Sequence, residues 1–164
     1  MREQSLKLAR RPLRRPSRRA QVLFRYFLIL SSQGDPHRTE NEIARAVVDV
    51  AFKIHNRFGP GLLESVYETI IAYELRKQAF HVREQPPLPV VYEEVRMNVG
   101  FRPDLIINNK VIVEVKSLES IAPVHKKQLL TYLRVADMRL GLLLNFGQSL
   151  MKDGISRIVN RLPE

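Results

Sequence analysis

Cysteine is absent from this 164-residue sequence, and several kinds of chemistry are excluded with it. Without thiols the chain has no disulfide framework, no cysteine nucleophile and no cysteine-bound zinc. A phosphate-cradling loop is also missing, because the Gly-Pro-Gly segment at residues 59–61 is not followed by Lys-Ser or Lys-Thr. In addition, His37, His55 and His81 lack the spacing of metal ligands.

Long apolar runs are also missing. The apolar stretch at residues 22–30 resembles the core of a secretory signal, but Arg25 interrupts it and no clear small-residue cleavage site follows. It is also far shorter than the roughly 20 residues that a membrane-spanning helix needs. We therefore expect no membrane partner, and the absence of cysteine fits a cytoplasmic location.

Negative charge is scarce at the start of the chain, so the net charge of +10 is unevenly distributed. Residues 1–38 contain ten basic and two acidic side chains, whereas the remaining 126 residues carry a net charge of only +2. Repeated prolines and like charges at residues 10–19 predict a disordered, dispensable extension. An export signal and a phosphate-binding arm are alternatives for this segment. Any nucleic-acid function must therefore rest on motifs in the rest of the chain.

The remaining residues, 39–164, have the length of one domain with its own core. A capping box formed by Thr39 and Glu42 predicts a helix that ends at the Gly-Pro-Gly segment, and a second helix should follow over residues 62–78. Extended runs then predict strands around residue 82, at 90–92, 99–107 and 111–116, followed by a helix at 123–136, a buried strand at 140–146 and a short strand or helix at 155–159. Two helices, a meander of strands, a helix and a strand indicate an α/β domain with a mixed sheet flanked by helices.

The most informative stretch is the predicted hairpin over residues 101–116. Because strand side chains alternate between faces, each strand of the hairpin has one face with charged groups and one face that is apolar. Asp104 and Ile106 share a face of the first strand, and Ile112, Glu114 and Lys116 share a face of the second. The opposite faces hold Leu105, Ile107, Val111, Val113 and Val115.

The length of the turn decides whether the charged groups meet. A two-residue loop at Asn108 and Asn109 would put Asp104 and Glu114 on opposite faces of the sheet. A three-residue loop that includes Lys110 pairs them directly and also matches the apolar sets, so we favour it. An asparagine in such a loop accepts the left-handed conformation that the turn needs.

Two carboxylates and an ammonium would then lie at one end of otherwise buried strands. An unpaired buried charge destabilises a fold by several kcal/mol, so some partner in the site must compensate these charges. One explanation is a salt-bridged sheet edge. The other is a site for a hard divalent cation such as Mg²⁺, which prefers carboxylate oxygens and water as ligands.

Three motifs resemble those of known nucleases. Pro103-Asp104 followed by Glu114-Val115-Lys116 resembles the PD-(D/E)XK signature. Gly61, Glu64 and Tyr67 have the spacing of the bacterial GxxExxY protein family, which belongs to the same superfamily. Gln128 and Tyr132 are similar to the QxxxY motif of RecB-like nucleases. The resemblance covers residues 39–160, including Phe101-Arg102.

The resemblance implies a single restriction-endonuclease-like domain that hydrolyses phosphodiester bonds with Mg²⁺ or Mn²⁺. It makes Asp104, Glu114, Lys116 and Glu64 the catalytic residues, with Asp104, Glu114 and Glu64 as metal ligands. Lys116 would orient the attacking water or stabilise negative charge. The remaining motif residues, which would bind substrate or support the site, are Gln128, Tyr132, Tyr67 and Arg102.

Several alternatives stay open. Glu64 also suits a helix start, where the helix dipole favours acidic residues, and Gln128 and Tyr132 could be ordinary, partly exposed helix residues. The implied partner is nucleic acid, with DNA preferred over RNA. Because a fold and a motif do not guarantee activity, the rival function is a non-catalytic module that binds nucleic acid or protein.

Overall fold

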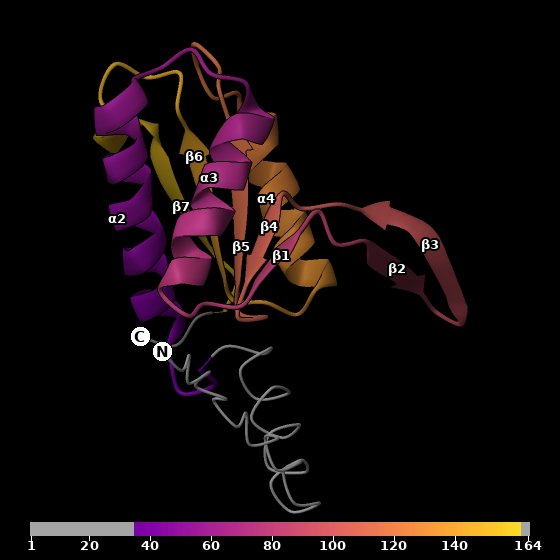
Figure 1. Ribbon diagram of the computed structural model, residues 1–164. Coiled ribbons are helices and arrows are strands. Elements are labelled where there is room, and N and C mark those ends of the chain that lie inside the picture. The colour runs from indigo at the N-terminus through magenta and orange to yellow at the C-terminus, as the bar shows by residue number, and fades with distance from the viewer. Residues whose placement is uncertain (1–34, 162–164) are drawn as a thin grey trace, which may run out of the picture.

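A computed structural model describes residues 35–161 of the chain. The five-stranded sheet has the order β1-β4-β5-β6-β7, with β5 and β6 parallel and the other neighbours antiparallel. Helices cover both faces of the sheet (Figure 1). The mixed α/β sheet flanked by helices is therefore confirmed. The elements are α2 (Glu40–Phe58), α3 (Glu64–Lys77), β1 (Val82–Glu84), β2 (Leu88–Tyr92), β3 (Val95–Phe101), β4 (Leu105–Ile107), β5 (Val111–Lys116), α4 (Pro123–Val135), β6 (Leu140–Asn145), the 3₁₀ turn η1 (Met151–Gly154) and β7 (Ile155–Val159).

The first two helices start and stop where their sequence predicts. Thr39 and Glu42 form both hydrogen bonds of the capping box, which supplies partners for amides exposed at the start of α2. Gly59 ends this helix with φ 65°, a left-handed value that favours glycine. The loop that follows turns the chain so that α3 packs beside α2.

The two faces of the β4–β5 hairpin belong to different cores, as the alternation of its side chains predicts. One face packs against α2 and α3, and the other packs against α4. The first core includes Leu105, Ile107, Val111, Val113 and Val115, whereas the second joins Ile106 and Ile112 to Leu129, Tyr132 and Leu133.

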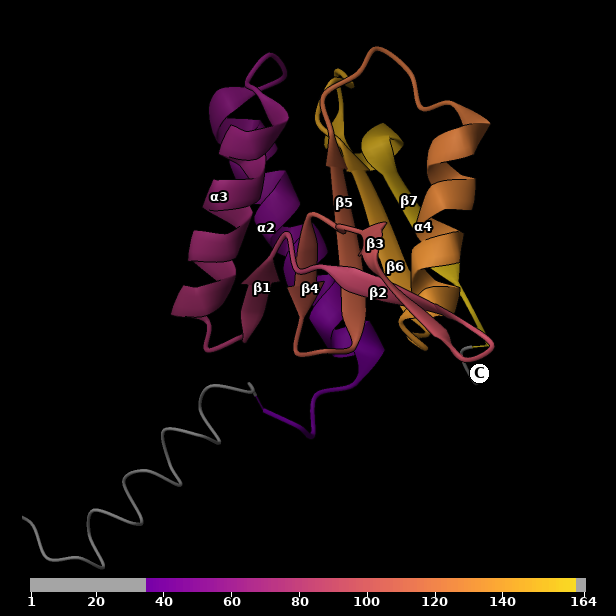
Figure 2. The same ribbon diagram turned by 90° about the vertical axis from the view of Figure 1, so that its right-hand side faces the viewer.

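The prediction of one continuous strand over residues 99–107 is wrong. β3 ends at Phe101 and β4 begins at Leu105, because Pro103 has no amide hydrogen to donate and the amide of Asp104 donates to a side chain instead of to a neighbouring strand. The predicted meander is also wrong. β2 and β3 form a separate two-stranded sheet, while β1 pairs with β4 across this insertion. We call β2 and β3 the ribbon. Figure 1 shows the ribbon projecting from the body, and Figure 2 views it from the side on which it projects.

The proposed boundary at residue 38 concerns mainly residues 1–34, which lie outside the described residues. The last residues before the boundary contact the body. The guanidinium of Arg38 lies 4.0 Å from the centre of the Phe80 ring and donates to the carbonyl of Gln78, and Lys110 donates to the carbonyl of Pro36. None of the helices within residues 35–161 is long and apolar enough to cross a membrane.

Candidate active site

The turn between β4 and β5 has the predicted three-residue form. Asn108 and Asn109 adopt φ values of 49° and 53°, and the amide of Lys110 donates to the carbonyl of Ile107. Pairing of Leu105 with Val113 fixes the register. Extending that register by one residue sets Asp104 opposite Glu114, as the matching of apolar faces predicts.

Asp104 and Glu114 are tied together by two hydrogen bonds that cross between their strands. The amide of Asp104 donates to Oε1 of Glu114 at 3.2 Å, and the amide of Val115 donates to Oδ2 of Asp104 at 2.7 Å. Each carboxylate therefore has one oxygen fixed by backbone. Oδ1 of Asp104 and Oε2 of Glu114 accept no hydrogen bond from the described residues.

The ammonium of Lys116 lies among the carboxylates. Its Nζ is 3.7 Å from both Oδ2 of Asp104 and Oε2 of Glu114, and it donates to the carbonyl of Val115 at 2.8 Å. These side chains are largely buried, with exposed fractions of 17%, 16% and 6% for Lys116, Asp104 and Glu114. Low exposure strengthens the attraction, because little water screens it.

Glu64 reaches the same cluster from the first turn of α3. Its Oε1 accepts from the amide of Ser117 at 2.9 Å, and its Oε2 lies 3.9 Å from Nζ of Lys116. The hydroxyl of Ser117 also donates to the carbonyl of Leu62. Glu64 therefore joins the start of α3 to the end of β5 as well as facing the ammonium.

A fourth carboxylate, Glu68, lies beside this cluster and was not predicted. It is only 9% exposed and accepts a hydrogen bond from Gln85. Burial raises its pKa, and the charge of Asp104 raises it further. The available signal was its position four residues after Glu64, which places both side chains on one face of α3. We define the acidic cluster as Glu64, Glu68, Asp104 and Glu114.

Crowding of carboxylates in a buried site changes their protonation. Burial, followed by the charge of Asp104, raises the pKa of Glu114 to about 7, and burial also raises the pKa of Asp104. Burial alone would lower the pKa of Lys116, but the surrounding carboxylates, Asp104 first, leave it raised. The site therefore has more negative charge than its one ammonium offsets, which is the electrostatic setting that attracts a cation.

A family model described as the PD-(D/E)XK nuclease superfamily matches residues 41–158. The chain belongs to the PD-(D/E)XK nuclease superfamily. Neither a curated protein nor a solved structure matched the chain. The span matched by the PD-(D/E)XK family contains the whole acidic cluster and Lys116, so the superfamily assignment and the site geometry concern the same residues.

Tyr67 forms no hydrogen bond with a described carboxylate of the acidic cluster, and its hydrogen bonds lie in the loop before α3. Its ring stacks on Phe146 at a centroid distance of 4.0 Å, and its hydroxyl donates to the carbonyl of Gly59 at 2.7 Å. The same oxygen accepts from the amide of Leu62 at 3.2 Å. Tyr67 thereby fixes the loop that leads to Glu64.

Gln128 and Tyr132 project from one face of α4, as their spacing predicts, and the amide of Gln128 donates to the hydroxyl of Tyr132. Tyr132 packs against Phe101, with ring centroids 4.9 Å apart. Burial raises the pKa of Tyr132, and the nearby charge of Glu114 raises it further. Tyr132 therefore lies close enough to the acidic cluster for the charge of Glu114 to shift its pKa. Neither Gln128 nor Tyr132 forms a hydrogen bond with a carboxylate of the described residues.

Arg102 lies two residues before Asp104 and lines a groove with Pro87, Pro89 and Arg96. Another unpredicted residue, Asn145, is fully buried and binds both the amide and the carbonyl of Leu118 with its side chain. Asn145 thereby fixes the segment that follows β5, next to Lys116.

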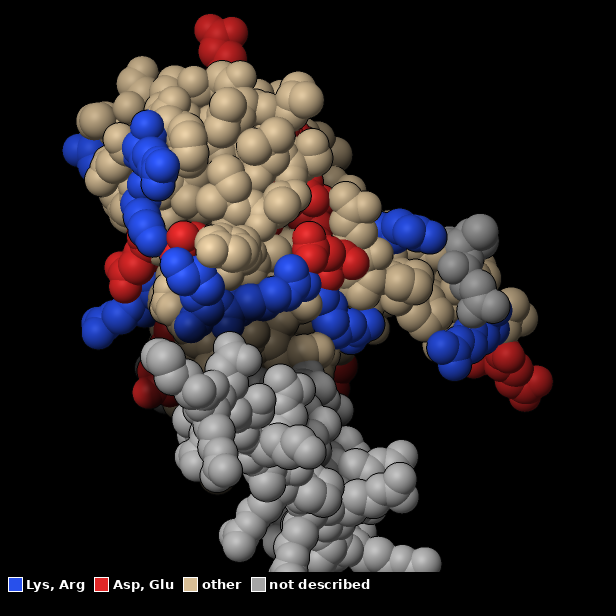
Figure 3. Space-filling model, viewed as in Figure 1, with Lys and Arg blue, Asp and Glu red and all other residues tan. Residues whose placement is uncertain are grey.

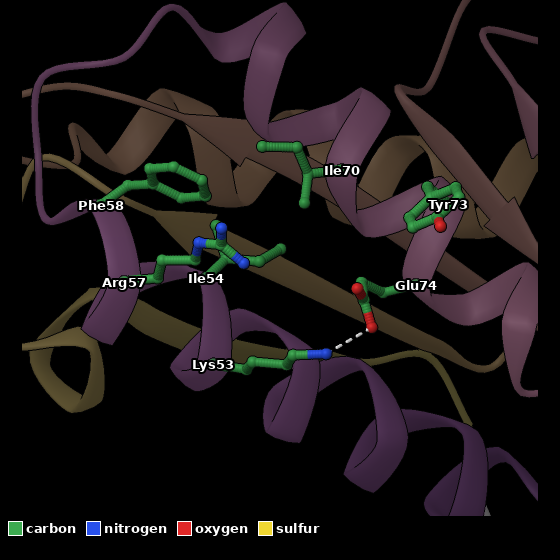
Figure 4. A pocket seen from close by; sticks show the side chains of 7 residues that line it. All are labelled: Lys53, Ile54, Arg57, Phe58, Ile70, Tyr73 and Glu74. Atoms are coloured by element: carbon green, nitrogen blue, oxygen red, sulfur yellow. Dashed lines mark hydrogen bonds and ion pairs between the residues drawn. The ribbon is translucent and has the colours of Figure 1, made fainter.

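A second cavity, of about 270 Å³, lies between α2 and α3 (Figure 4). Its walls are mainly apolar, and Lys53 pairs with Glu74 across it at 2.6 Å. No member of the acidic cluster lines it. The lining residues are Lys53, Ile54, Arg57, Phe58, Ile70, Tyr73 and Glu74. The carboxylate chemistry of this PD-(D/E)XK domain is therefore separate from this cavity.

Proposed function

We propose that this chain is a divalent-metal-dependent nuclease that hydrolyses phosphodiester bonds in DNA. The observation that carries the proposal is the convergence of Asp104, Glu114 and Glu64 on the ammonium of Lys116 within 3.7–3.9 Å. One carboxylate is enough to balance the charge of a buried lysine. The additional carboxylates around Lys116 therefore favour a site that binds a further cation.

The donor chemistry fits Mg²⁺ or Mn²⁺, because these hard cations prefer carboxylate oxygens and water. Asp104, Glu114 and Glu64 would hold the ion, each with an oxygen that the backbone does not occupy. The chemistry that a divalent cation supplies in such a site is activation of the attacking water and neutralisation of charge on the scissile phosphate. Glu68, when ionised, would add negative charge beside these ligands.

Lys116 has a separate role in the proposal. Its ammonium, held near the two strand carboxylates, would orient the attacking water or stabilise negative charge that develops on the phosphate. The hydrogen bond to the carbonyl of Val115 fixes the direction in which the side chain extends. A group held in place before the reaction needs little reorganisation during it.

Four further residues would support the reaction from around this centre. Tyr67 holds the loop before Glu64, and Gln128 and Tyr132 on α4 would orient a phosphate or the hydration shell of the ion. Arg102 would bind the substrate. The spacing of Gly61, Glu64 and Tyr67 supports a finer assignment to the GxxExxY family within the superfamily.

The direct test is degradation of labelled DNA, single- and double-stranded, and of RNA by the purified full chain with Mg²⁺ or Mn²⁺. We expect cleavage of DNA that stops on adding a chelator and resumes with excess metal. Asp104→Ala or Glu114→Ala should abolish cleavage, and Glu64→Ala should give an intermediate loss. Cleavage that continues unchanged in the chelator would contradict metal dependence.

One observation favours a non-catalytic binding module as the second candidate. Within residues 35–161, no three acidic or histidine side chains are arranged as a ready-made metal site. The ammonium of Lys116 instead lies among the carboxylates. If metal does not stabilise the fold and no substrate is cleaved, but nucleic acid or protein is bound, the binding module replaces the nuclease.

A further inference from the structure

The ribbon and the residue that follows it contribute two arginines to one groove. The base of the ribbon is anchored to α4, because Leu88 and Phe101 join the core that contains Tyr132, while the rest projects from the body (Figure 1). Arg96 lies next to the turn of the ribbon, where it pairs with Val91, and Arg102 directly follows β3, yet both line the same groove. Two positive side chains thus converge on one space of about 370 Å³.

The groove lacks an internal partner for this charge. Neither Arg96 nor Arg102 forms an ion pair or a side-chain hydrogen bond with the described side chains, which are those of residues 35–97 and 100–161. Pro87 and Pro89 complete the lining with rigid rings that have no amide hydrogen to offer an anion. Two guanidinium groups that lack a carboxylate partner therefore determine which ligand the groove can bind. Each guanidinium group can donate two hydrogen bonds to the oxygens of a phosphate.

The position of the groove matters because the acidic cluster repels a polyanion. Figure 3 shows Asp and Glu side chains gathered in the middle of this face, with Lys and Arg side chains on the neighbouring ribbon. Arg102 is separated from Asp104 by Pro103 alone. A phosphate held in the groove would therefore keep the adjoining nucleotides close to the carboxylates despite the repulsion.

From these relationships we infer that the groove of Pro87, Pro89, Arg96 and Arg102 is a phosphate-binding site for the nucleic-acid strand next to the bond that is cleaved. The inference rests on the proposed nuclease function and adds the site that positions its substrate. The acidic turn at Glu93 and Glu94 marks the limit of this surface, since it would repel a strand that continued to the tip of the ribbon.

Salt-dependent binding tests the inference. Affinity of the full chain for labelled single-stranded and duplex DNA is measured by fluorescence anisotropy in chelator over a range of salt concentrations. Removing one phosphate contact should reduce the slope of log affinity against log salt by about 0.7 for single strands or about 0.9 for duplex. We expect that reduction for Arg96→Ala and for Arg102→Ala, and about twice that for the double variant.

Arg45→Ala is the matched control. Arg45 is exposed on α2, which lies on the other side of the body from the ribbon in Figure 1, and the substitution removes the same charge. Its slope should equal that of the wild type. Arg102→Lys should restore the slope but not the full affinity, because it keeps the charge and loses the two-pronged hydrogen bonding.

The outcomes separate this inference from the proposed function. If the wild type binds DNA and the groove variants keep the wild-type slope, the phosphate site is wrong while the nuclease remains. If the wild type binds neither DNA form, both proposals are overturned. Melting temperatures equal to that of the wild type would show that the slope changes do not arise from unfolding.

Discussion

Asp104 and Glu114 face each other across adjacent strands, and each helps to fix the other's position. Glu114 accepts from the amide of Asp104, while Asp104 accepts from the amide of Val115, the residue next to Glu114. The pair therefore shapes the end of the sheet as well as contributing charge.

Asp104→Asn should separate metal binding from folding. The amide oxygen can still accept from Val115, so the strand geometry should survive, but a neutral ligand binds a hard cation weakly. For the wild type, Mg²⁺ at one hundred times its Kd should raise the free energy of unfolding by about 2.7 kcal/mol. Thermal melts should show this rise for the wild type and for the exposed control Asp49→Asn, but not for Asp104→Asn. Equal Mg²⁺ stabilisation of all three proteins would rule out Asp104 as a ligand.

Stability of the metal-free protein should fall as the pH rises from about 4.5 to about 7. The pKa of Glu114 is raised from 4.5 to about 7, so the folded state holds a proton that the unfolded state has released. Folding is therefore favoured by Glu114 at low pH, and this contribution is lost as the pH rises through the folded pKa. Urea titrations of the wild type and of Glu114→Gln, both in the presence of a chelator, isolate the contribution of Glu114. The free energy of unfolding of Glu114→Gln should fall less between about pH 4.5 and about pH 7 than that of the wild type. Identical dependence on pH in the two proteins would contradict the raised pKa of Glu114.

The turn at Asn109 should tolerate glycine but not valine. Asn109 has φ 53°, which a β-branched residue adopts at a cost of about 1–2 kcal/mol, whereas glycine adopts it freely. Both substitutions remove the hydrogen bond from Arg83 to the Asn109 side chain, so their difference reports the backbone alone. Chemical denaturation should find Asn109→Val less stable than Asn109→Gly by that amount. A valine variant as stable as the glycine variant would show that the left-handed turn is not required.

Tyr67→Phe should lower stability through the loop before α3. The substitution keeps the ring on Phe146 but removes both hydrogen bonds of the hydroxyl, to Gly59 and from Leu62. Leaving such groups without partners costs about 1–3 kcal/mol. The exposed Tyr73→Phe is the matched control and should have no effect in the same denaturation experiment. If the two variants were equally stable, Tyr67 would not anchor this loop.

Much of the site could be predicted because strand alternation and turn length are local properties. The apolar residues of β4 and β5 match on one face only if the loop has three residues, and that choice also brings Asp104 opposite Glu114. The helix boundaries followed from the capping box at Thr39 and from Gly59. Patterns of this kind need no knowledge of distant contacts.

The missed features depend on contacts between distant segments. The sequence predicts a meander that includes the ribbon, because the alternation of its side chains is that of any strand. Only the pairing of β1 with β4 reveals the insertion. Asn145 binds the backbone of Leu118, which is 27 residues away along the chain. Glu68 had a local signal, its spacing from Glu64, but its burial depends on Gln85 and on the sheet.

The nuclease assignment is tested most directly by measuring both DNA cleavage and metal binding for Lys116→Ala. Removing the ammonium takes a positive charge away from the carboxylates, so Mg²⁺ should bind with equal or higher affinity while DNA cleavage is abolished. Lys126→Ala, an exposed lysine of α4, controls for the loss of charge and should cleave like the wild type. Labelled-DNA degradation and Mg²⁺-dependent melting, measured on the same preparations, give both results. Full cleavage by Lys116→Ala, or no cleavage of DNA or RNA by the wild type with Mg²⁺ or Mn²⁺, would contradict the nuclease assignment.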